Sequence, residues 1–259
     1  MKRESRQQAI MDLLVAEGNV DLDSLAERFA VSRMTIHRDL DELESAGLLR
    51  KVRGGATIES GTRFESDFRF RERQGGAAKS AMATEALDLV EPGMTVMIND
   101  GSMAALLGER LTAKRPLTVI TNNAAVIDAL KAEAGITLIA LGGLYSPKFN
   151  AFLGKVTEEA LESLRADIAF ISTPGVSGLE VFHMDEQVVR AKRLMMDKAR
   201  IRCLVVNHAR FGHAALYRLG ALAEFDHIIT DDQPDARTAK TFRDAGLTLT
   251  IARKDEAAE

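Results

Sequence analysis

The chain has little of several features that define other classes of protein. Its 259 residues include a single cysteine, Cys203, no tryptophan and only 5% aromatic residues. One cysteine excludes an intramolecular disulfide framework and a zinc site built from several thiolates. No apolar run approaches the roughly 20 residues that cross a bilayer, and the charged start MKRESRQQAI lacks the apolar core of a signal peptide. We therefore expect a cytoplasmic protein with an aliphatic core and no membrane partner.

An overall excess of basic residues, the usual mark of a nucleic-acid binder, is also missing, because the net charge is −4. This total does not exclude a basic contact face, since attraction to phosphate is screened over about 8–10 Å. The hydrophobic share of 46% and the charged share of 28% are ordinary for a globular protein. The length allows a small domain joined to a larger one.

Residues 1–58 have the spacing of three short helices followed by a hairpin. Apolar side chains recur at helical spacing in 5–16 and 22–29, and Asp21 is a good N-cap for the second helix. Ser32 is a preferred N-cap for a third helix, which Gly47 ends. Two short helices, a tight turn and a third helix form a helix-turn-helix, whose third helix enters the major groove of DNA.

The third helix buries one apolar stripe, made of Ile36, Leu40 and Leu43, and so turns its hydrogen-bond donors outward. Residues 48–58 then read as two short strands joined by a Gly-Gly turn, a wing with three cations in four residues. Such side chains bind phosphates and base edges. The predicted DNA-binding residues are Ser32, Arg33, Thr35, His37, Arg38, Arg50, Lys51 and Arg53.

The alternative for this region is a three-helix cap with a solvated surface. Acidic residues are plentiful on the third helix, and in a DNA-binding domain they have to face away from phosphate. They are Asp39, Asp41, Glu42 and Glu44. The basic hairpin directly after the helix favours the DNA-binding interpretation.

The same residues resemble the DNA-binding signature of DeoR-type repressors, V-S-x-x-T-I-R-R-D-L-x-x-L and then a basic wing that ends in G-G-A. This chain has VSRMTIHRDLDEL at 31–43 and GGA at 54–56, and the resemblance covers residues 3–57. His37 departs from it, because the family usually has Arg there. A neutral imidazole offers one donor and no fixed charge, so phosphate affinity or operator preference is expected to differ.

Residues 59–77 lack a sustained period and are charged, which predicts an interdomain linker whose Phe64, Phe68 and Phe70 partly dock. From residue 78 to 259 short apolar strands alternate with helices. This alternation predicts a Rossmann-like, mostly parallel α/β sheet with helices on both faces. The expected strands are 94–99, 117–121, 136–141, 168–172, 202–206, 227–230 and 247–251.

Polar residues stand repeatedly just after these strands, where open α/β sheets bind their ligands. Gly101 and Ser102 also open a helix, whose free N–H groups favour a phosphate. Any single one of these turns is more often an ordinary N-cap, but their recurrence at one sheet edge favours a binding site there.

Residues 75–252 resemble the DeoR-type sensor domain, which is similar to ribose-phosphate and glucosamine-phosphate isomerases. The resemblance implies a phosphorylated sugar or a related metabolite as effector. Together with the strand-end pattern it predicts the effector-binding residues Asn99, Gly101, Ser102, Thr121, Asn122, Gly142, Gly143, Gly175, Lys192, Asn207, Arg210 and Asp231.

Departures from the sensor-domain motifs are concentrated in two loops. The family's D-x-G-T-T is NDGSM at 99–103, and its D-x-S-K-F-G is NHARFG at 207–212. Asp100 is not expected to replace the missing acid at position 99, because neighbouring residues of a strand point to opposite faces. Either the effector differs from the family norm or the pocket is degenerate. Lys192 is a candidate anion partner, although a lysine among other helical cations is more often solvated.

The rival interpretation is a sugar-phosphate isomerase-like enzyme. Isomerisation through an enediol needs a carboxylate base and a group that stabilises the oxyanion. The paired-acid and Lys-Gly-Gly motifs of the isomerases are absent, and Asn99 and Asn207 occupy two positions where a base could stand. The five histidines lack ligand spacing, and no Walker loop, G-x-G-x-x-G or H-E-x-x-H occurs. We expect no catalytic residue, no cofactor and no metal.

A scaffold protein, the third possibility, would leave the recognition helix and wing unexplained. The sequence thus predicts a winged helix-turn-helix at 1–58, a linker at 59–77 and a sensor domain at 78–259. We expect a repressor of a carbohydrate or polyol catabolic operon that a small, sugar-like or phosphosugar-like effector releases from double-stranded DNA. Reading two half-sites one DNA turn apart favours a homodimer or homotetramer.

Overall fold

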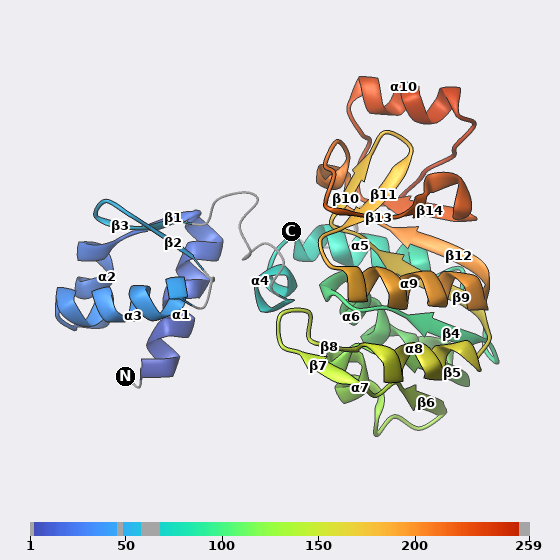
Figure 1. Cartoon of the computed structure of the whole chain (residues 1–259), viewed down its shortest axis with the longest axis horizontal. Helices are drawn as coiled ribbons and strands as arrows, with labels where there is room; N and C mark the ends of the chain where they lie inside the picture. The colour runs from blue at the N-terminus through green and yellow to red at the C-terminus, as the bar shows by residue number, and fades with distance from the viewer. Residues whose placement is uncertain (1–2, 46–48, 58–67, 254–259) are drawn as a thin grey trace. The chain divides into compact units, whose positions relative to one another are not determined.

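A computed structural model of the chain describes residues 3–45, 49–57 and 68–253. It contains two compact units, Met1–Gln74 and Gly75–Glu259 (Figure 1). The helix end expected at Gly47 and the linker positions Gly61 and Phe64 lie outside the described residues.

The described residues within 3–57 of the N-terminal unit combine three helices with a small antiparallel sheet in the order β1-β3-β2. The elements are α1 (Arg3–Glu17), β1 (Asn19–Asp21), α2 (Leu22–Phe29), α3 (Arg33–Ser45), β2 (Arg50–Val52) and β3 (Gly55–Thr57). The apolar stripe of α3 is buried as expected, since Ile36 and Leu40 are 0% exposed. The strand β1 was not expected from the sequence, because three residues are too short to show a period.

The predicted helix caps of this unit are confirmed. The Asp21 side chain accepts a hydrogen bond from the Ser24 N–H at 2.9 Å, and Ser32 Oγ accepts one from the Thr35 N–H at 3.2 Å. The wing turn is made by Arg53 and Gly54, whereas Gly55 lies in β3 rather than in the turn. A Cβ at Gly55 would lie 1.9 Å from the Val20 carbonyl oxygen, so pairing of β3 with β1 requires glycine there.

A short helix, α4 (Phe68–Arg73), occupies part of the segment where the sequence showed no period. The next helix, α5 (Gly76–Leu87), begins two residues earlier than the expected 78. Gly75 precedes it with a φ of 63°, a left-handed conformation that glycine adopts at little cost.

The C-terminal unit is built around a seven-stranded parallel sheet in the order β15-β14-β12-β9-β4-β5-β6 (Figure 1). Its strands are β4 (Thr95–Ile98), β5 (Leu117–Thr121), β6 (Ile136–Ala140), β9 (Ala166–Ser172), β12 (Ala199–Val205), β14 (His227–Thr230) and β15 (Thr250–Ile251). The further helices are α6 (Ser102–Arg110), α7 (Ala124–Leu130), α8 (Lys155–Glu162), α9 (Glu186–Lys198) and α10 (Ala236–Asp244). The parallel α/β architecture is therefore confirmed.

Successive residues of a strand point to opposite faces of the sheet, so the apolar strands of this unit present apolar side chains on both faces. Helices cover both faces. In β9, the side chains of Ile168 and Phe170 pack in one apolar cluster with residues of α5, α6 and α7. The neighbouring Ala169 and Ile171 pack in a second cluster with residues of α8, α9 and α10. Since all seven strands run in parallel, their carboxyl ends meet at one edge of the sheet.

Five short strands had no counterpart in the sequence prediction. They form a hairpin and a three-stranded antiparallel sheet in the order β10-β11-β13. The bounds are β7 (Leu144–Ser146), β8 (Ala151–Leu153), β10 (Gly175–Ser177), β11 (Glu180–His183) and β13 (Tyr217–Ala221). Strands of three to five residues carry too little pattern to be told from loops. Within the described ranges, no helix is long and apolar enough to cross a bilayer.

Candidate functional site

The outer face of α3 presents the donor side chains that the sequence assigned to DNA contacts. Ser32, Arg33, His37 and Arg38 are exposed, and Thr35 is half-buried. On the wing, Arg50 and Arg53 are exposed and Lys51 is half-buried. All eight predicted residues are thus accessible on the surface of this unit.

Some of these donors already have partners within the unit. Arg33 Nε lies 2.7 Å from the Asp23 carboxylate of α2, and the hydroxyls of Ser32 and Thr35 lie 2.9 Å apart. Both Arg33 and Asp23 remain more than half exposed. DNA phosphates can therefore compete for Arg33 at little cost, since exposed ion pairs contribute little.

The acids of α3 are all engaged by other parts of the unit. Asp39 is 1% exposed and accepts hydrogen bonds from Arg6 Nε at 2.5 Å and Arg6 Nη2 at 3.1 Å. This hydrogen bonding to Asp39 raises the pKa of Arg6. Glu42 pairs with Arg3 at 3.0 Å, also on α1.

The other two acids are held by the wing. Lys51 Nζ lies 2.5 Å from an Asp41 carboxylate oxygen, and the Lys51 N–H donates to Glu44 at 2.7 Å. The four acids of α3 therefore hold this helix to α1 and to the wing. The ion pairs of Asp39, Asp41 and Glu42 also offset negative charge on the helix that presents Arg38.

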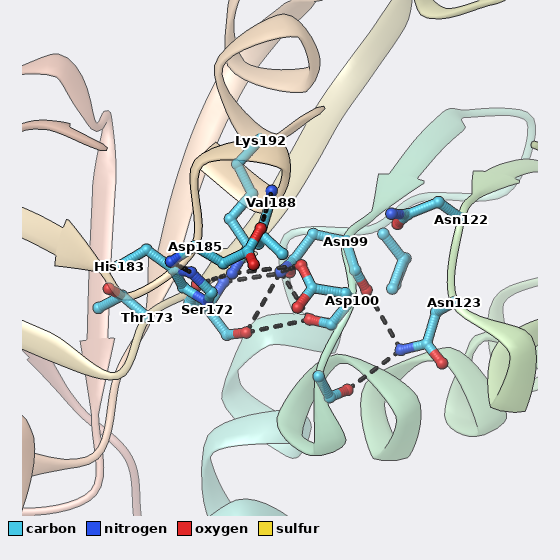
Figure 2. A network of polar contacts seen from close by, with 12 residues as sticks. Asn99, Asp100, Asn122, Asn123, Ser172, Thr173, His183, Asp185, Val188 and Lys192 are labelled. Carbon is cyan, nitrogen blue, oxygen red and sulfur yellow. Dashed lines mark hydrogen bonds and ion pairs between the residues drawn. The ribbon is translucent and has the colours of Figure 1, made fainter. Parts of the chain in front are cut away.

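The second candidate site lies at the carboxyl edge of the parallel sheet, where Asn99 joins two central strands. Its Nδ2 donates to the Asp100 carbonyl oxygen at 2.6 Å and to Ser172 Oγ at 3.3 Å, and its Oδ1 accepts from the Ser172 N–H at 3.1 Å (Figure 2). Asn99 is 1% exposed, so its amide is used within the protein.

Lys192 is buried, not solvated as helical lysines usually are. Its Nζ lies 3.3 Å from Asp100 Oδ1 and donates to the Ser172 carbonyl oxygen at 2.8 Å (Figure 2). Both side chains of this ion pair are 2% exposed. Asp100 therefore supplies a carboxylate to the network although position 99 is an amide, and the buried cation is neutralised by the chain itself.

Two asparagines follow β5 and have different surroundings. Asn123 Nδ2 donates to the carbonyl oxygens of Asn99 and Gly101 at 3.2 and 3.1 Å, which ties β5 to the loop that opens α6. Asn122 Nδ2 donates to the Phe152 carbonyl oxygen at 3.0 Å, but its buried Oδ1 has no hydrogen-bond partner among the residues that the structure describes. A buried acceptor without a donor is costly, which makes Asn122 a candidate contact for a ligand hydroxyl.

Thr121, Gly101 and Ser102 are further predicted residues at this edge of the sheet. Thr121 Oγ1 donates to the Ile98 carbonyl oxygen at 2.7 Å and is fully buried, so it supports the sheet edge. Gly101, with a φ of 104°, precedes the first turn of α6, where Ser102 is 7% exposed. Gly101 has no side chain to cap this helix, so within the described residues the first N–H groups of α6 are suited to an anion.

Two of the three predicted glycines have a steric reason. A Cβ at Gly143 would lie 2.6 Å from the Leu153 carbonyl oxygen, and one at Gly175 would lie 2.5 Å from the His213 carbonyl oxygen. These close approaches account for Gly143 and Gly175 without an effector. At Gly142 a Cβ would meet nothing within 4 Å, and the Gly142 carbonyl oxygen accepts a hydrogen bond from Thr157 Oγ1 at 2.6 Å.

Asp231 is surrounded by donors from the loop after β12. Its carboxylate accepts from Asn207 Nδ2 at 2.7 Å and from the His208 N–H at 2.7 Å, and His208 Nδ1 lies 2.9 Å away. A carboxylate can only accept, so His208 Nδ1 carries a proton and Nε2 points away from Asp231. Asp231 and Asn207 therefore orient His208, and Arg210 lies half-buried two residues later.

The sequence-based prediction omitted Asp100, Ser172 and His208 from the site. Ser172 ends β9, and Asp100 and His208 follow the ends of β4 and β12 within three residues, so the position at a strand end was the available signal. Two surface hollows, of about 320 and 540 Å³, lie at the opposite edge beside Gly93 and Pro116 and beside Arg165 and Lys198. In the part of the chain that the structure describes, no group of three or more His, Cys, Asp or Glu side chains is placed to hold a metal ion.

Comparison with known proteins finds relatives along nearly the whole chain. Residues 6–62 match the DeoR-like helix-turn-helix domain, and residues 75–232 match the DeoR C terminal sensor domain. An uncharacterized HTH-type transcriptional regulator, YgbI, of Escherichia coli (strain K12) is 30% identical over 250 residues, which cover 96% of this chain and 98% of that protein. The glycerol-3-phosphate regulon repressor of the same strain is 27% identical over 255 residues, 97% of this chain and 100% of that protein.

A solved structure of D-ribose-5-phosphate isomerase in complex with phospho-erythronic acid overlaps less completely. Its TM-score is 0.37 at 18% identity, over 51% of this chain and 52% of that chain.

Proposed function

The chain belongs to the DeoR family of transcriptional regulators, and we propose that it represses a carbohydrate or polyol catabolic operon until a small, sugar-like effector binds. Both of its units match domains of DNA-binding regulators, so it is a transcription regulator and not a metabolic enzyme. The proposal concerns the direction of regulation, the effector and the residues that contact each ligand.

One observation carries the DNA-binding assignment. The acids of α3 are engaged by α1 and the wing, while Arg38 and His37 remain exposed on the same helix. An outward arginine in a recognition helix is suited to bidentate contact with guanine, and the wing cations are suited to phosphate. We assign the phosphate contacts to Arg50, Lys51 and Arg53.

The polar groups at the sheet edge support a polyhydroxylated effector. Asn122 Oδ1 is a buried acceptor that a ligand hydroxyl would satisfy. The first turn of α6 beside Gly101 and Ser102 is suited to a phosphate of the same ligand. Lys192 acts through Asp100 and Ser172, as a residue that holds the loops in place.

The proposed regulator works as a homodimer or homotetramer, since two recognition helices that read two half-sites give practical specificity. Effector binding shifts the placement of the DNA-binding units only if the effector binds the two states with different affinities. Such coupling typically changes operator affinity about 5- to 150-fold.

The proposed DNA binding is tested with a gel-shift titration of the full-length protein, at low salt, on the DNA upstream of its own gene. Arg38→Ala should weaken this binding, whereas Arg200→Ala, which removes an exposed cation of the other unit, should not. Equal binding by wild type and Arg38→Ala contradicts the assigned role of Arg38.

The proposed effector binding is tested by thermal-shift screening with free and phosphorylated sugars and polyols. Each compound that stabilises the protein is then tested for release of DNA. A ligand that both stabilises the protein and releases DNA supports repression relieved by an effector. A ligand that strengthens DNA binding would instead make the protein an effector-dependent binder and overturn that part of the proposal.

A further inference from the structure

Met34 lies on the outward side of the recognition helix. The buried stripe of α3 is centred between Leu43, Ile36 and Leu40, and at about 100° per residue Met34 lies on the opposite side of the helix. The structure agrees, because Met34 is 62% exposed. An apolar side chain thus points away from the core in the first turn of α3, the part that meets base edges in a helix-turn-helix.

Exposure of one apolar residue is common and carries nothing by itself. The exposure of Met34 is informative because the polar side chains beside it are bound to other groups of the same unit. Arg33 is drawn toward Asp23 at 2.7 Å, and the Ser32 and Thr35 hydroxyls face each other at 2.9 Å. The first turn of α3 therefore offers its long apolar side chain outward while the donors around it are engaged.

Arg38 stands four residues after Met34, so the two side chains are neighbours on the same helix face. Four residues span about 6 Å of helix, which is about two base-pair steps of 3.4 Å. A base contacted by Met34 would therefore lie within about two base pairs of the base contacted by Arg38.

We propose that Met34 reads the 5-methyl group of a thymine within about two base pairs of the base that Arg38 contacts. Thymine presents the one apolar group on the major-groove edge of the standard bases. The flexible, polarisable thioether of methionine packs well against such a group. This inference rests on the proposed DNA-binding function and adds a specificity-determining residue to it.

The experiment begins by selecting binding sites for the full-length protein from a random duplex library. Each thymine of the selected site is then replaced in turn by deoxyuridine, which lacks the methyl group but keeps the same hydrogen-bonding edge. Wild type should lose about four-fold in affinity at one thymine of each half-site, which converts to about 0.8 kcal/mol, the value of one buried methyl-sized group.

Two variants of Met34 and one matched control complete the test. Met34→Gln keeps the side-chain length but should lose the deoxyuridine effect at that thymine, whereas Met34→Leu should retain part of it. Val52→Ala trims another exposed apolar side chain of the same unit, 40% exposed, and should leave the effect unchanged. Circular dichroism checks that each variant is folded.

The proposal is wrong if wild type binds every deoxyuridine-substituted site as tightly as the parent site. It is also wrong if Met34→Gln shows the same loss as wild type at the sensitive thymine. If selection enriches no sequence and wild type does not bind DNA at low salt, the proposed DNA-binding function is wrong as well. This outcome differs from the failure of the Met34 proposal alone, in which wild type still binds a selected site.

Discussion

Arg6 on α1 holds Asp39 on α3 in a buried, two-point contact, with Arg6 Nε 2.5 Å from Oδ2 and Nη2 3.1 Å from Oδ1. The Arg6 and Asp39 side chains are 9% and 2% exposed. The contact fixes the recognition helix against the first helix from the side opposite to Met34. It also explains how an acid can stand beside Arg38 without facing phosphate.

Arg6→Ala should destabilise the N-terminal unit by about 3 kcal/mol, because Asp39 would be left buried without its cation. Chemical denaturation of the full-length protein, followed by circular dichroism, measures the change. Arg3→Ala removes the exposed partner of Glu42 and should cost less than about 1 kcal/mol. Equal costs for the two variants would show that the Arg6 contact is no stronger than a surface pair.

Lys51→Ala should weaken binding to all DNA sequences alike and reduce the slope of log affinity against log salt by about one unit. Arg38→Ala should instead cost about 1–3 kcal/mol, mostly on the specific site. Binding titrations at several salt concentrations, on specific and unrelated DNA, distinguish the two roles. If Lys51→Ala loses affinity only for the specific site and not for unrelated DNA, the assignment of Lys51 to a phosphate contact is wrong.

Lys192→Met should destabilise the C-terminal unit, because the Asp100 carboxylate would stay buried without its cation. Adding Asp100→Asn should recover part of the lost stability, since it removes the uncompensated charge. The measurement is the melting temperature of the three variants beside wild type. A double variant less stable than Lys192→Met would indicate that Asp100 holds the loops without need of the lysine.

Asp231→Asn should change the tautomer of His208 and release its ring. In wild type the proton sits on Nδ1, toward the carboxylate, and nitrogen NMR of the labelled imidazole should report that tautomer. His208→Gln provides the assignment of the signal. An unchanged imidazole spectrum in Asp231→Asn would mean that the carboxylate does not orient the ring.

Arg193 Nη1 on α9 lies 2.5 Å from Glu224 Oε2, and this ion pair should make the stability of the C-terminal unit depend on pH. Burial raises the pKa of Glu224, but the hydrogen bond from the Ala221 N–H and the pairing with Arg193 outweigh it, so the pKa lies below its ordinary value. The folded state therefore gains stability above about pH 4.3, the unfolded value, and loses it as pH falls through the lower folded pKa.

Glu224→Gln should lose part of this acid sensitivity while keeping the length of the side chain. Melting temperatures from pH 7 down to pH 3 measure it, with Glu186→Gln, an exposed glutamate of the Arg190 pair, as control. Parallel pH profiles for wild type and Glu224→Gln would contradict the assignment.

The local pattern of the chain was sufficient for the main elements. Asp21 and Ser32 cap their helices as expected because an N-cap acts within three residues of itself. The alternation of apolar strands and helices from residue 78 was sufficient for the parallel sheet. Strands as short as β1, and the small sheet of β10, β11 and β13, were missed because their stability comes from partners distant in sequence.

By itself the sequence determined the recognition helix, the wing and the edge of the sheet at which polar residues gather. Only the tertiary structure decided which charged groups form pairs. Asp39 binds Arg6, which is 33 residues away in the sequence, and Lys192 is buried against Asp100. Periodicity records which side of an element faces the core, but it carries no information on which distant group lies opposite. Whether a charged side chain is solvated, paired or available to a ligand depends on that opposite group.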